Sequence, residues 1–356
     1  MLDHTHVIGQ MSEDQKIRIL TDIHSLAEPE LAALGVPPVA CGIAHTGCGG
    51  EYPSSAHLAC SWDKILLADV SESLCSDLFR RGVNHVLLPG AAAGDNPFDD
   101  ALSEDPYLAG ELAGAYLTGT TLTGMSVSLD GYGMTAVGTD CVGELTAIRT
   151  RKSMLDAPYL RALKEGPGAG LVVRAGEPVT LEEEPAIILC RPARERETVK
   201  AIAEGRICIS GSATGLQKAL HQFRRLQADV QHGRATTGEL EAACACGEAI
   251  SEETLDAGVA RLLSFAQACR EAETRVSHAD FPQEDLAYRA ALASTVLLEN
   301  RNRPRGKQKT LPLTSPGKLC LVGDVEGLGS RALSGAMDAL TAVGHTVVGH
   351  AVGYAL

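Results

Sequence analysis

The sequence predicts an α/β protein built on a (β/α)8 barrel of the TIM type, and three observations support this fold class. Short apolar runs alternate with amphipathic stretches of helical periodicity, which predicts parallel strands with helices packed outside them. The alternation repeats often enough before residue 270 to favour closure into a barrel over an open sheet. The length of 356 residues is sufficient for one large barrel or for two ordinary domains.

The predicted elements follow one another in the order that a barrel requires. Residues 11–34 are predicted to be helical, because apolar residues recur at helical spacing after Ser12, which suits an N-cap. Gly35 and the two prolines that follow it break this helix and lead into a short strand. The later predicted strands are 83–90, 125–129, 170–173, 186–190 and 206–210, and the later predicted helices are 108–117, 155–164 and 195–204.

The last third of the chain predicts helices, a linker and a small β-α-β unit. Residues 216–271 are mostly helix-forming, with Ser251 opening the helix that ends the barrel. Proline, glycine and basic residues then mark a linker, and a strand, a helix and a second strand follow it at 318–323, 331–343 and 345–348. The expected organisation is a barrel over 1–270, a helix and linker over 271–317, and a partial second α/β domain over 318–356. The last of these is smaller than a domain that supports its own core.

The composition excludes some classes of partner. The net charge of −14 disfavours nucleic acid and anionic membranes. Aromatic residues make up only 4 %, with Trp62 as the one tryptophan, which counts against a strong stacking platform for sugars. The chain shows no secretion signal and no apolar stretch of membrane-spanning length, so a cytoplasmic protein is expected.

The eleven cysteines are scattered and odd in number. Cys190 and Cys208 lie inside apolar runs, so the favoured interpretation is buried free thiols. Cys244 and Cys246 form a lone C-x-C pair, whereas a structural zinc site needs two more ligands at short spacing. We therefore expect neither a metal nor a cofactor.

Several motifs occur in a fixed order along the chain. They are GVPP at 35–38, YPSSA at 52–56, SWD at 61–63, SEDPYLAGELAGAY at 103–116, ISEETLD at 250–256, VLLEN at 296–300 and LPL at 311–313. Together these segments resemble the β-glucosidase-like glycoside hydrolase family 3, in family order over nearly the whole chain. The resemblance implies an amino-terminal barrel followed by the start of an α/β sandwich domain.

The resemblance fails at the positions that carry the family's chemistry. It implies a nucleophilic aspartate in an S-D-W run after a buried strand. Here the strand 187–189 is followed by Cys190, Arg191 and Pro192, so Arg191 stands where the aspartate is expected. A guanidinium stays protonated and cannot attack an anomeric carbon. It would also repel an oxocarbenium-like transition state.

The family's other site residues are replaced as well. Its sugar-binding K-H pair falls at 130–131, just before Tyr132, its loop aspartate falls near Ile43, and its arginine falls at Pro97. The family's acid/base comes either from the second domain, of which one unit is present here, or from a loop histidine. The corresponding loop, 133–140, contains no histidine. The resemblance therefore implies that both half-reactions lack their groups.

Two interpretations remain for the charged residues at the expected site. Asp130 and Asp140 are candidates for a relocated catalytic pair, or else a loop cap and a solvated loop charge, which is the favoured interpretation. Arg191 either binds an anionic ligand or pairs with Asp130 and keeps an empty pocket neutral. Arg191, Asp130 and Tyr132 are the candidate residues of the pocket mouth.

The leading hypothesis is a pseudo-glycosidase that acts in carbohydrate binding, scaffolding or regulation. Its expected partners are a carbohydrate ligand and either a second copy of the chain or an active family member, because an incomplete sheet exposes an edge. The alternative is an active O-glycosyl hydrolase with relocated carboxylates. A third hypothesis is a truncated gene product.

Overall fold

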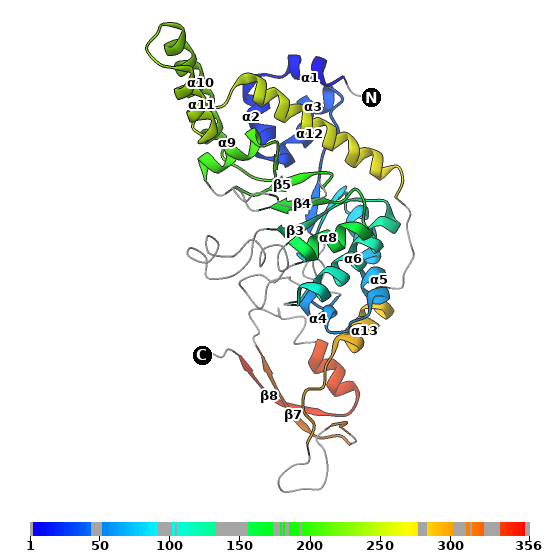
Figure 1. Ribbon diagram of the computed structural model, residues 1–356. Helices are drawn as coiled ribbons and strands as arrows, with labels where there is room; N and C mark the ends of the chain where they lie inside the picture. The colour runs from blue at the N-terminus through cyan, green and yellow to red at the C-terminus, as the bar shows by residue number, and fades with distance from the viewer. Residues whose placement is uncertain are drawn as a thin grey trace. The chain divides into compact units, whose positions relative to one another are not determined.

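The chain is described here by a computed structural model. It describes residues 3–43, 52–91, 102–103, 105–132, 156–173, 179, 181, 185–192, 194–276, 283–301, 311–313, 315–323 and 335–352. The chain divides into two compact units, Met1–Thr295 and Val296–Leu356 (Figure 1).

The first unit is built on a parallel sheet. In the described residues this sheet has six strands, which lie side by side in chain order. They are β1 (Cys41–Ile43), β2 (His85–Leu88), β3 (Ser126–Tyr132), β4 (Gly170–Val173), β5 (Ile188–Cys190) and β6 (Ile207–Cys208). Every neighbouring pair is parallel. Sequential strand order with helical crossovers is the topology of a (β/α) barrel, so the predicted fold class is confirmed.

Helices connect these strands and cover the sheet. The connecting helices are α4 (Ser55–Ala59), α5 (Lys64–Arg80), α6 (Pro106–Thr123), α8 (Ala157–Glu165) and α9 (Glu195–Ala203). The helices that follow β6 are α10 (Ala213–Gln231), α11 (Thr237–Ala245), α12 (Glu252–Glu273) and α13 (Gln283–Ser294). As predicted, Ser251 caps α12, since its side chain accepts a hydrogen bond from the backbone N–H of Thr254.

Helix α6 is mostly apolar, and most of its residues are buried, although Tyr107 and Leu122 are exposed. It packs against α5 on one flank and α8 on the other. Asp105 caps its first turn, Pro106 begins it, and Gly124 ends it with a φ of 78°. A Cβ atom at Gly119 would overlap the carbonyl oxygen of Ala68, so the close approach of α5 and α6 requires a glycine there.

The predicted single helix over residues 11–34 is wrong, because the structure divides it into α2 (Glu13–Thr21), a 3-10 helix at Ile23–Ala27 and α3 (Pro29–Ala33). Ser12 caps α2 in a capping box, as predicted. The break lies at Asp22, whose backbone is extended with a φ of −148° and forms an antiparallel bridge with Ser210, just past β6. This contact with the sheet replaces helix continuation and places Ile23 in the core.

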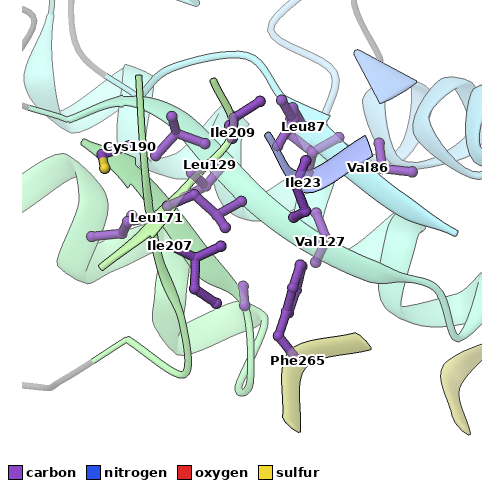
Figure 2. Packing of buried hydrophobic residues seen from close by; sticks show 14 of the residues in the cluster. Ile23, Val86, Leu87, Val127, Leu129, Leu171, Cys190, Ile207, Ile209 and Phe265 are labelled. Carbon is purple, nitrogen blue, oxygen red and sulfur yellow. The ribbon is translucent and has the colours of Figure 1, made fainter. Parts of the chain in front are cut away.

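The core of the first unit is one cluster of buried side chains. Figure 2 shows residues of β2 to β6 in this cluster, together with Ile23 and with Phe265 of α12. All four residues of β2 and of β4 are buried, as expected for parallel strands covered on both faces. Cys190 and Cys208 are buried free thiols, as predicted, and Cys75 and Cys269 are buried too, whereas Cys60 and Cys246 are exposed.

The second unit contains the predicted β-α-β arrangement in its described residues. Strands β7 (Lys318–Gly323) and β8 (Thr346–Val352) pair in parallel, and a helix over 335–342 connects them. In the described part of the chain, no helix is both long and apolar enough to cross a membrane.

Candidate functional site

The carboxyl ends of the six parallel strands lie at one edge of the sheet, which we call the mouth. Strand β3 reaches the mouth with Asp130 and Tyr132, and Arg191 follows β5 directly. The β3–β4 pairing shifts register between Leu129 and Tyr132, and Gly131 has a φ of 82°. Such an irregularity redirects the side chains beside it, as bulges next to functional sites commonly do. Local backbone geometry therefore positions Asp130.

Asp130 and Arg191 form an ion pair at the mouth. The Nη1 atom of Arg191 lies 2.7 Å from Oδ2 of Asp130, and the two side chains are 36 % and 22 % exposed. The other carboxylate oxygen, Oδ1, accepts a hydrogen bond from the N–H of Gly131 at 2.8 Å. The expected pairing of Arg191 with Asp130 is therefore present. Partial exposure limits the contribution of such a pair to stability to about 1 kcal/mol or less.

Two tyrosines form the buried layer next to this ion pair. The hydroxyl of Tyr132 donates to Oδ1 of Asp156 at 2.8 Å, and the hydroxyl of Tyr159 donates to the backbone oxygen of Asp130 at 2.8 Å. Their rings meet edge to face with centroids 5.1 Å apart. Tyr132 is therefore a buried support of the mouth, with its hydroxyl engaged by a carboxylate.

Asp156 is the residue of this network that sequence reasoning missed. It occupies the N-cap position of α8, yet its side chain makes no capping hydrogen bond and accepts one from Tyr132 instead. The available signal was an acidic residue just before Ala157 and Pro158, the pattern of a helix start. That pattern predicts a cap, and only the fold brings Tyr132 within reach.

Gly90, which follows β2, approaches the same network closely. A Cβ atom there would lie 2.9 Å from the backbone oxygen of Asp130 and 3.3 Å from the hydroxyl of Tyr159. The end of β2 can pack against β3 and α8 at this point because residue 90 has no side chain. The base of the mouth is thus tightly packed.

Cys41 begins β1, where it pairs in register with His85 of β2. Burial raises the pKa of Cys41 to about 12, and the positive charge of Arg191 lowers it by a smaller amount. The thiol therefore stays protonated near neutral pH and is a weak nucleophile.

The carboxylates of the described mouth are engaged by neighbouring side chains. A retaining glycosidase needs two carboxyl groups roughly 5 to 5.5 Å apart, one of them free to attack carbon. Here Asp130 is paired with Arg191 and Asp156 accepts from Tyr132. The other catalytic candidate, Asp140, lies outside the described residues. Within the described part of the chain, no three His, Cys, Asp or Glu side chains are grouped so as to hold a metal ion.

Comparison with known proteins gives related sequences but no matching family model. A probable β-glucosidase H of Aspergillus flavus is 25% identical over 368 residues, covering 93% of this chain and 42% of the relative. A thermostable β-glucosidase B of Acetivibrio thermocellus is 24% identical over 302 residues, covering 76% of this chain and 36% of the relative. The chain thus spans less than half the length of these curated relatives.

Solved structures show the same fold. A β-glucosidase from Kluyveromyces marxianus matches with a TM-score of 0.62 and 17% identity, over 99% of this chain and 46% of that chain. A family 3 β-glucosidase from Bifidobacterium adolescentis matches with a TM-score of 0.58 and 18% identity, over 89% of this chain and 48% of that chain. The resemblance to family 3 glycoside hydrolases is thereby supported in both sequence and fold.

Proposed function

We propose that this glycoside hydrolase family 3-like chain is a pseudo-glycosidase, which binds a carbohydrate at the mouth without hydrolysing it. One observation carries the proposal. Arg191, at the position where the family resemblance implies the nucleophile, is paired with Asp130 at 2.7 Å. A paired guanidinium cannot form the glycosyl bond of a retaining mechanism, and its charge opposes a cationic transition state.

A carbohydrate ligand is the partner that the comparisons favour. One structure of the Kluyveromyces marxianus β-glucosidase is a complex with glucose, and it matches this chain with a TM-score of 0.61 at 16% identity. The hydrogen-bonding groups of the described mouth suit sugar hydroxyls, since Asp130 accepts and Arg191 donates. A scaffolding or regulatory role, with a second copy or an active family member as partner, is the corresponding proposal for the whole protein.

The test is hydrolysis of aryl β-glycosides by the purified chain. The panel consists of the glucoside, xyloside, N-acetylglucosaminide and arabinoside, with an active β-glucosidase as the positive control. We expect no turnover above that of a heat-inactivated sample, while titration with glucose gives saturable binding. Turnover that co-purifies with the chain and is lost in the Asp130→Ala, Asp140→Ala double variant would overturn the proposal and establish the active alternative.

A further inference from the structure

A second candidate site lies at the amino-terminal ends of the strands, at the edge of the sheet opposite the mouth. It is a cavity of about 750 Å³, which is within the range of small-molecule sites. We call it the amino-end cavity. The starts of β3 to β6, the turns before them and one face of α12 enclose it. The lining residues used below are Val127, Ile187, Ile207, Arg261, Phe265 and Arg275.

The described lining of the amino-end cavity is positively charged, whereas the chain as a whole is acidic. It contains two arginines, Arg261 and Arg275, and no aspartate or glutamate, although the chain carries a net charge of −14. The rest of the lining is largely apolar, with Val127, Ile207 and Phe265 among its side chains. An apolar chamber with a cationic group matches a ligand that has an apolar body and one negative charge.

Arg261 has a hydrogen-bonding group left over. Its Nη2 donates to the backbone oxygen of Ile202 at 3.2 Å. Its Nε is buried and has no hydrogen-bond partner. In the described part of the chain, Arg261 forms no ion pair. The positive charge of Arg261 thus has no carboxylate partner among the described residues, and an anionic ligand in the cavity would supply one.

A structural role for Arg261, as a donor to carbonyl groups at helix ends, explains only part of its hydrogen-bonding capacity. Helices α6, α8 and α9 end near the cavity, just before or at Gly124, Gly166 and Gly205, and the carbonyl groups of their last turns attract a cation. The bond from Arg261 to Ile202 is of this kind. It uses one of the five N–H groups of the guanidinium and does not neutralise its charge.

We propose that the amino-end cavity binds a small amphipathic carboxylate. Arg261 is its counter-ion, Arg275 adds positive charge at the more exposed side, and Phe265 and Ile207 contact the apolar body. This site is separate from the mouth and does not depend on whether the mouth hydrolyses a glycoside.

Calorimetric titration of the full chain with octanoate tests the proposal. Octylammonium and octan-1-ol serve as the cationic and neutral probes of the same length. We expect octanoate to bind with one saturable site, and to bind at least about ten-fold more tightly than either of the other probes. The absence of saturable octanoate binding, or equal affinity for octylammonium, would refute the proposal.

Variants identify the cavity as the place of binding. Arg261→Gln should weaken octanoate binding about ten-fold or more. The matched control Arg225→Gln removes an exposed arginine of α10 that is not among the lining residues, and should bind as the parent does. Ala268→Leu, at an exposed lining position, fills space and leaves the guanidinium in place, so it should weaken octanoate binding even if Arg261→Gln fails to fold. Unchanged affinity in a folded Arg261→Gln or in Ala268→Leu contradicts the assignment.

Discussion

The two ends of the sheet hold their polar side chains in opposite ways. At the mouth, Asp130 and Arg191 are charged, partly exposed and paired with each other. At the amino end, His85 is fully buried, and its ring nitrogens lie 2.9 Å and 3.1 Å from the hydroxyls of Ser126 and Ser128. Phe265 packs edge to face against its ring.

The difference follows from access to water. Burial lowers the pKa of His85 to about 3, so this histidine stays neutral and exchanges hydrogen bonds with two neutral hydroxyls. Solvent reaches both side chains of the ion pair at the mouth. A neutral buried network contributes strongly to stability when complete, whereas a half-exposed ion pair contributes little. Substitution of the charged residues at the mouth should therefore lower the stability of the fold only slightly.

Replacing His85 should produce the largest effect on stability. His85→Leu leaves the buried hydroxyl of Ser128 and the half-buried hydroxyl of Ser126 without the imidazole partner, and we expect the free energy of unfolding to fall by about 2–4 kcal/mol. Urea unfolding measures this change. The control is His221→Leu at an exposed position of α10, which should shift the free energy by less than about 0.5 kcal/mol. Equal effects of the two substitutions would contradict the comparison.

The neutral state of His85 should also make stability depend on pH. The pKa of His85 is lowered from 6.5 to about 3 in the folded chain, so below pH 6.5 the unfolded chain binds more protons. Stability is thus complete above pH 6.5 and falls as pH falls towards 3. Between pH 6.5 and 4.5 the loss should reach about 2–3 kcal/mol. Urea titrations of the parent and of His85→Gln measure it, and parallel pH curves would show that His85 is not responsible.

The smallest effect is expected at the mouth. A double-mutant cycle of Arg191→Gln and Asp130→Asn should give a coupling energy below about 1 kcal/mol, because both side chains are partly exposed. The coupling should shrink further in concentrated salt, which screens exposed charges. A coupling above about 2 kcal/mol would place this pair with the buried network and remove the contrast between the two ends.

Much of the fold could be predicted from local signals in the sequence. Ser12 and Ser251 begin their helices as predicted, and the β4 strand has its predicted bounds. The break at Asp22 could not be predicted, because it depends on a bridge to Ser210, far away along the chain. Periodicity detects a helical face but not a competing partner from the sheet.

The candidate site was only partly predictable for the same reason. The pairing of Arg191 with Asp130 followed from two opposite charges expected at the carboxyl ends of strands, which meet at one mouth of a barrel. The role of Asp156 did not follow, because its local pattern indicates a helix cap. The amino-end cavity is enclosed by turns before four strands and by α12, and no single motif marks such an enclosure.

Because some cysteines are exposed and others buried, thiol labelling can report which parts of the fold open. A thiol reagent added to the folded chain meets the exposed thiols of Cys60 and Cys246 at once. The buried thiols of the described residues react only when the element that holds each of them opens. They lie on four different elements: α5 (Cys75), β5 (Cys190), β6 (Cys208) and α12 (Cys269). The order in which these positions acquire label thus reports which parts of the sheet and its helical cover separate first.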